Sequence, residues 1–93
     1  MRTIRRSTRF KKDFKREFRA GHGAAFEEAL TAILQQLADD TPLPDRLFDH
    51  ALTGNWIGYR DCHIRPDLVL IYQKPDANTL DLIRLGSHSE LDL

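Results

Sequence analysis

The chain has 93 residues, of which 41% are hydrophobic and 30% are charged, and its formal net charge is zero. The length fits one domain spanning residues 1–93, and the composition is typical of a folded globular protein rather than a disordered chain. No uncharged stretch approaches the about 20 apolar residues of a membrane helix, and the N-terminus lacks the apolar region of a signal peptide. The single cysteine, Cys62, excludes an internal disulfide and a multi-cysteine zinc site. We therefore expect a reduced, cytoplasmic protein.

The charge is divided unequally along the chain. Residues 1–19 carry nine Lys and Arg against two acidic residues, a net charge of +7, and the remainder carries −7. A basic segment of this kind is typical of proteins that bind nucleic acid or an acidic partner, although it also occurs on a solvated helix face.

The predicted elements begin with a short strand at residues 1–7 and a helix capped by Ser7 or Thr8. Three aromatic residues with i, i+4, i+8 spacing predict that one face of this helix packs in the core: Phe10, Phe14 and Phe18. Gly21 ends the helix, and a second amphipathic helix is predicted at residues 23–38. The two helices should form an antiparallel hairpin.

Three runs typical of strands follow a proline-rich break: residues 56–64, 68–74 and 79–85. Their short, turn-rich separators predict an antiparallel meander, which the first strand joins. In the last strand, alternation places Leu80, Leu82 and Arg84 on one face. The residues between and after them lie on the other face: Asp81, Ile83 and Leu85. The predicted fold class is α+β, with an N-terminal strand and a helix hairpin packed on an antiparallel sheet.

Candidate chemical groups gather in the second half of the chain: His50, His63, Asp67, Arg84 and His88. Imidazoles, a carboxylate and a cation suit metal-free phosphodiester transfer, in which one group takes the proton of a ribose 2′-hydroxyl and another protonates the departing 5′-oxygen. The spacing of His63 and Asp67 also fits a metal site, and each histidine taken alone fits an ordinary packed or exposed residue. We interpret His22, beside glycines in the helix turn, as an ordinary residue of this kind.

Strand alternation places His63 on the same face as Asp61 and opposite Trp56 and Cys62. Trp56 suits either base stacking or packing. Cys62 reads as a small core residue.

A histidine-rich pattern runs through this region: His50-x-Leu52-x-Gly54-x-Trp56-x-Gly58-x-Arg60-x-x-His63-x-x-x-Asp67, followed by Arg84-x-Gly86-Ser87-His88. This pattern closely resembles the YafQ branch of the RelE/ParE toxin superfamily, and the resemblance covers almost the whole chain. It implies a RelE-like fold and a bacterial type II toxin. Such a toxin is a ribosome-dependent endoribonuclease that cuts mRNA in the ribosomal A site. From the metal-free chemistry above, we expect no cofactor and products with 2′,3′-cyclic phosphate ends.

The resemblance also implies partners. These are a cognate antitoxin, in a complex expected to be a heterotetramer, and the 30S A site with its mRNA and rRNA. Operator DNA would be bound only through the antitoxin.

The resemblance implies a catalytic set, expected to line one concave patch on the sheet side: His50, His63, Asp67, His88 and Arg84. We expect His88 to be the general acid, Asp67 or a neighbouring histidine the base, and Arg84 the phosphate cation. The residues expected to contact RNA are Lys11, Lys12, Lys15, Arg16, Trp56 and Arg65. Leu68 and Asp92 stand where relatives often carry aromatic residues, which bears on base stacking and codon preference.

Two other functions fit the same scaffold. A toxin on the ParE side of the superfamily binds DNA gyrase without catalysis, but it lacks the histidines. An inactive toxin relic acting as a binding module is the second alternative.

Overall fold

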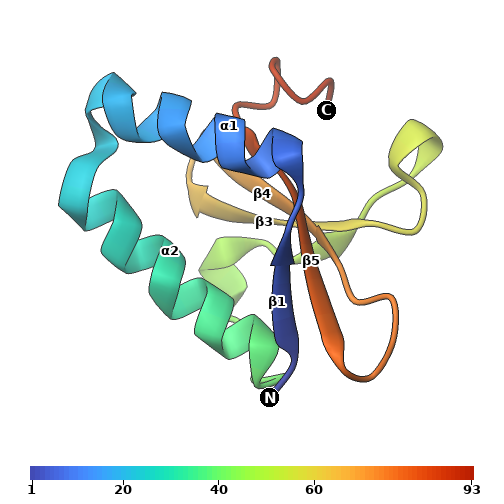
Figure 1. The fold of residues 1–93 in the computed structure, drawn as a ribbon. Helices are drawn as coiled ribbons and strands as arrows, with labels where there is room; N and C mark the ends of the chain where they lie inside the picture. Colours follow the sequence, from blue (N-terminus) through green and yellow to red (C-terminus); the bar gives the residue numbers. More distant parts are fainter.

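The computed structural model describes the backbone of residues 1–93 and every side chain except that of His22. Our interpretation of His22 therefore lies outside the described side chains. Two helices, α1 (Thr8–Glu17) and α2 (Gly23–Ala38), pack on a five-stranded sheet with the strand order β1-β5-β4-β3-β2 (Figure 1). The predicted α+β class is confirmed.

The N-terminal region folds into the predicted strand and helix hairpin. After β1 (Thr3–Arg6), the hydroxyl oxygen of Ser7 accepts a hydrogen bond from the backbone N–H of Phe10 at 2.9 Å and caps α1. The same hydroxyl donates to the carbonyl of Ile83 at 2.7 Å, which ties the start of α1 to the sheet. A π-helical turn, Phe18–His22, contains Gly21 at a φ of 98°, a value that glycine adopts easily, and α2 then runs back along the sheet.

The predicted meander is confirmed as β3 (Arg60–Arg65), β4 (Leu68–Gln73) and β5 (Thr79–Gly86), which pair antiparallel. A short strand that we did not predict, β2 (His50–Ala51), pairs antiparallel with β3. The prediction of a wholly antiparallel sheet is wrong, because β1 runs parallel to β5 and the sheet is mixed. Short turns force antiparallel pairing only on strands that they connect, and no such turn joins β1 to β5.

The main core lies between the helices and the sheet, where Phe10, Phe26 and Leu30 pack against Leu70 and Leu82. The prediction that Phe18 belongs to this core is wrong, since its side chain is 43% exposed. Phe18 continues the helical stripe, with φ −60° and ψ −45°, but it lies at the C-terminal end of α1, beyond the buried residues that cover Phe10. Its ring still contacts Phe14, with ring centroids 6.1 Å apart.

The strand predicted at residues 56–64 is wrong in its first part. Gly54–Trp56 form a 3-10 turn and the strand begins only at Arg60, because Gly54 and Gly58 adopt left-handed φ values of 64° and 91°. Trp56 consequently packs with Val69 and Ile71 on the sheet face away from the helices. This is the face of His63 rather than the opposite face that we predicted.

Alternation in β3 itself is as predicted: Cys62 and Ile64 are buried in the helix-side core, and Asp61 and His63 face the other way. In β5 the alternation is wrong beyond Ile83. A register shift between Ile71 and Tyr72 of β4 inserts an extra residue in β5, so Leu85 joins Leu80 and Leu82 in the helix-side core. Neither α1 nor α2 is long and apolar enough to cross a bilayer, and the same holds for every helix in the described chain.

Candidate active site

A hollow of about 500 Å³ opens on the sheet face that the helices leave uncovered. It brings together three of the predicted catalytic residues, His50 from β2, His63 from β3 and His88 from the segment after β5. The remaining lining residues come from the 48–56 segment, from β3 and from the C-terminal end: Phe48, Leu52, Thr53, Gly54, Asn55, Trp56, Asp61, Asp92 and Leu93.

His50 is held in one tautomer by its neighbours. Its Nδ1 lies 2.7 Å from the carbonyl oxygen of Phe48. A carbonyl oxygen only accepts hydrogen bonds, so Nδ1 carries the hydrogen. In the neutral ring, Nε2 is then the atom with the available lone pair, which suits a proton acceptor.

His88 is fixed in a similar way by Asp67 in the turn between β3 and β4. Asp67 Oδ1 accepts from His88 Nδ1 at 2.7 Å and from the His88 backbone N–H at 3.2 Å. These bonds, the side-chain bond first, lower the pKa of Asp67, which keeps it ionised at neutral pH. An ionised carboxylate only accepts hydrogen bonds, so Nδ1 of His88 carries a hydrogen and Nε2 is the ring nitrogen left to exchange a proton.

The ring of His63 lies between the rings of His88 and Phe48. Its ring centroid is 5.0 Å from that of His88 and 5.6 Å from that of Phe48, and the Phe48 ring is 4.8 Å from His50. The three histidines therefore line one hollow, and Asp67 is linked to it through its hydrogen bond to His88 without lining it.

Asp61 is a site residue that our sequence reasoning missed. Its side chain is 3% exposed, and burial, which outweighs the attraction of the three nearby histidines, raises the pKa of this carboxyl group. Oδ1 of Asp61 lies 3.0 Å from Nδ1 of His50 but does not accept its hydrogen, because that hydrogen points to the carbonyl of Phe48. Among the described side chains, this Oδ1 is therefore a buried oxygen without a hydrogen bond. The alternation that placed Asp61 beside His63 was the signal that could have identified it.

The segment that carries His88 is anchored by two residues that we predicted to contact RNA. Arg16 of α1 pairs with Glu90 (Nε to Oε2, 3.2 Å) and donates to the carbonyl of Leu85 at 2.9 Å. Trp56 donates its indole N–H to the carbonyl of Leu91 at 3.1 Å. Both side chains thus serve the position of the tail, whatever else they contact.

The prediction that Arg84 shares the patch with the histidines is wrong. Arg84 instead reaches α1, where its Nε donates to Oδ2 of the buried Asp13 at 2.7 Å. The Arg84 side chain is only 14% exposed. Hydrogen bonds from Arg84 and from the backbone of Leu85 offset the burial of Asp13 and lower the pKa of its carboxyl group. Arg84 therefore braces β5 against α1 in this structure.

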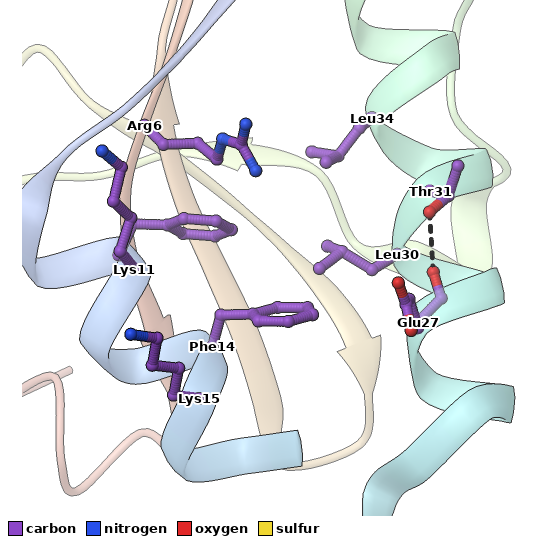
Figure 2. Close-up of a pocket in the computed structure, with 9 residues that line it drawn as sticks. Arg6, Lys11, Phe14, Lys15, Glu27, Leu30, Thr31 and Leu34 are labelled. Atoms are coloured by element: carbon purple, nitrogen blue, oxygen red, sulfur yellow. Dashed lines mark hydrogen bonds between the residues drawn. The ribbon is translucent and has the colours of Figure 1, made fainter.

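The basic side chains of α1 lie on another part of the surface. Lys11, Lys12 and Lys15 are exposed, as predicted. Figure 2 shows Lys11 and Lys15 with Arg6 at the edge of a second hollow, of about 370 Å³, between α1 and α2. Arg65, at the end of β3, is also exposed.

A protein metal site needs several donor side chains gathered around one point. In the part of the chain that the structure describes, no three or more His, Cys, Asp or Glu side chains are grouped so as to hold a metal ion. Cys62 is fully buried, and burial raises the pKa of its thiol to about 12, so it offers no thiolate.

Comparison with known proteins agrees with this geometry. A family model described as a bacterial toxin of type II toxin-antitoxin system, YafQ, matches residues 2–93. The chain belongs to the YafQ toxin family. This membership confirms both the resemblance and the RelE-like fold expected from it.

Solved structures of YafQ-type toxins superpose closely on the chain. A metal-bound toxin from Helicobacter pylori is 43% identical, with a TM-score of 0.87 over 98% of this chain and 99% of that one. The toxin of the DinJ-YafQ complex from Escherichia coli is 36% identical, with a TM-score of 0.82 over 98% of each chain. The mRNA interferase toxin YafQ of E. coli K12 is 48% identical over 50 residues, which span 54% of this chain and only about half, 53%, of that relative.

Proposed function

We propose that this YafQ-family toxin is a ribosome-dependent endoribonuclease that cleaves mRNA in the ribosomal A site by metal-independent acid–base chemistry. The observation that carries the proposal is the convergence of three imidazoles, two of which have Nδ1 fixed by oxygens that accept hydrogen bonds. The name of the E. coli relative, mRNA interferase toxin, supports the same reaction class.

His50 is the general base in this proposal. With Nδ1 donating to Phe48, its Nε2 accepts the proton of the ribose 2′-hydroxyl. The freed O2′ then attacks the adjacent phosphorus. Asp67, the other candidate that we considered, already accepts two hydrogen bonds from His88 and is less suited to the role.

His88 is the general acid. As the bond between phosphorus and O5′ breaks, Nε2 of the imidazolium transfers its proton to O5′, and Asp67 stabilises the imidazolium before transfer. The products carry a 2′,3′-cyclic phosphate and a 5′-hydroxyl, and the two proton transfers leave His50 charged and His88 neutral. Solvent exchange restores both.

His63 stabilises the negative charge that develops on the phosphoryl oxygens in this proposal. It lies 5.0 Å from His88 and is partly open to the hollow. Arg84 reaches the phosphate only if its pair with Asp13 opens, so we assign it a bracing role in the free toxin.

The basic surface of α1 supplies the contacts that hold the toxin on its target. Phosphate contacts depend on local rather than total charge, so the exposed Lys11, Lys12 and Lys15 suit ribosomal RNA despite a net charge of zero. A cognate antitoxin is the second expected partner, and the DinJ-YafQ complex supports it.

The test uses purified toxin and ribosomes programmed with a defined message. Wild-type protein should cut the message with or without EDTA, and His88→Ala should slow cleavage by about 100- to 10,000-fold, because it removes a proton donor used in the transition state. His22→Ala is the matched control, because it removes the one histidine of the chain that has no role in the proposal, and this variant should cleave normally.

Three results would contradict the proposal. Cleavage abolished by EDTA with intact ribosomes would move the histidines to a metal site. Full activity of His88→Ala would remove the acid assignment. Inhibition of gyrase without any effect on translation would favour the non-enzymatic toxin.

A further inference from the structure

Phe48, at the rim of the three-histidine hollow, combines two unfavourable features. Its side chain is 59% exposed, and its backbone adopts the left-handed conformation with φ 51° and ψ 44°. A residue that carries a β-carbon seldom takes this conformation, and a large apolar side chain gains little from exposure to water. Such a combination is retained where the residue has a role beyond packing.

The left-handed backbone places both the carbonyl and the ring of Phe48 beside the candidate base. The carbonyl accepts from Nδ1 of His50, and the ring lies 4.8 Å from His50 and edge-on to His63 at 5.6 Å. The ring therefore forms a wall of the hollow next to the residues that would handle the ribose 2′-hydroxyl.

The other positions at which an aromatic ring could stack on a base offer no comparably open ring in this chain. Leu68 is buried in the helix-side core, and Asp92 has no ring. Trp56 also lines the hollow, but it is partly buried, edge-on to Tyr59 and bonded through its N–H to Leu91. Phe48 presents the more open aromatic surface.

We propose that Phe48 is the stacking surface for the nucleobase on the 5′ side of the cleaved bond. The proposal rests on the endoribonuclease function proposed above. The attacking 2′-hydroxyl belongs to the 5′ nucleotide, so the base of that nucleotide lies on the side of His50 and Phe48. His88 serves the leaving 3′ nucleotide across His63. Aromatic side chains hold unpaired bases by stacking, with little preference for base identity.

The test compares Phe48→Asn with the wild-type toxin on ribosomes programmed with three messages. One is intact, one has an abasic sugar 5′ of the cleaved bond, and one has an abasic sugar 3′ of it. Asparagine tolerates the left-handed backbone and keeps the carbonyl bonded to His50, so this variant should fold at least as stably. Phe48→Tyr keeps the stacking surface, and Ile57→Asn removes another exposed apolar side chain, 76% exposed and outside the hollow.

We expect Phe48→Asn to lower kcat/KM on the intact message by about 5- to 150-fold, the usual range for one lost stack. On the 5′-abasic message wild type and Phe48→Asn should be equal, whereas on the 3′-abasic message the difference should persist. Phe48→Tyr and Ile57→Asn should resemble wild type. A purely positional effect on His50 would slow all three messages alike and would overturn the proposal, as would coupling to the 3′ base or unchanged cleavage by Phe48→Asn. Failure of the wild type to cut any message would overturn the endoribonuclease function itself.

Discussion

Replacing Asp61 with asparagine should stabilise the protein while impairing the site. Asp61 Oδ1 is a buried acceptor without a hydrogen bond, and an arrangement of this kind costs about 1–3 kcal/mol, more when the group is charged. Asparagine has the same shape without the charge. Because the amide leaves one imperfectly bonded oxygen, we expect a gain of about 1 kcal/mol, which in a domain of this size raises Tm by about 4–8 °C.

Urea denaturation at several pH values tests both the size and the origin of this gain. Burial raises the pKa of Asp61, so the native wild-type protein takes up a proton at a higher pH than the unfolded chain does. The wild type is therefore stabilised relative to Asp61→Asn as pH falls from 8 toward about 4, the ordinary pKa of an aspartate, and the difference between the two proteins should narrow. In cleavage assays Asp61→Asn should be slower than wild type, because the hollow loses the negative charge that faces its three histidines.

Two outcomes would refute this reasoning. An Asp61→Asn protein that is less stable than wild type at pH 8 would show that the carboxylate is well solvated or bonded in the native state. A stability difference that stays constant from pH 8 down to about pH 4 would show that burial does not raise the pKa of Asp61.

Two further predictions concern the basic helix and the tail. Charge reversal of Lys11 or Lys15 should weaken ribosome binding. It should also lower the slope of the logarithm of the binding constant against the logarithm of the salt concentration by about one per lost phosphate contact. Unchanged affinity at low salt would show that these lysines are merely solvated and do not contact RNA. Trp56→Phe keeps an aromatic ring but removes the hydrogen bond to Leu91, which should lower the free energy of unfolding by about 1 kcal/mol. Amide hydrogen exchange at residues 88–93 should become faster. Unchanged exchange there would show that the bond does not hold the tail.

Local sequence signals were sufficient for most of the elements. Ser7 caps α1, Gly21 turns the helix hairpin, and the apolar runs after residue 67 form β4 and β5. These features depend on a few neighbouring residues, and caps, glycine φ values and hydrophobic periodicity record such short-range preferences directly. The histidines were likewise recognisable from their pattern before any geometry was known.

The errors have local as well as distant causes. Trp56 has a strand-like setting, but left-handed glycines on both sides of it form a turn that sends it to the other face of the sheet. Phe18 continues the aromatic spacing, but it stands at the end of α1, where the core no longer covers it. The direction of β1 depends on β5, which lies more than 70 residues away, and no local turn specifies it.

For the candidate site, sequence alone determined which residue types are present, and tertiary structure decided which of them meet. His50, His63 and His88 come together because β2 and β4 flank β3 and the chain returns past them after β5. Arg84 is kept away from the histidines by Asp13 of α1, a partner 71 residues away in the sequence. Asp61 and Phe48 joined the site through burial and a left-handed backbone. Side-chain burial and register are properties of the assembled sheet, and a one-residue shift changes the face on which every following side chain lies.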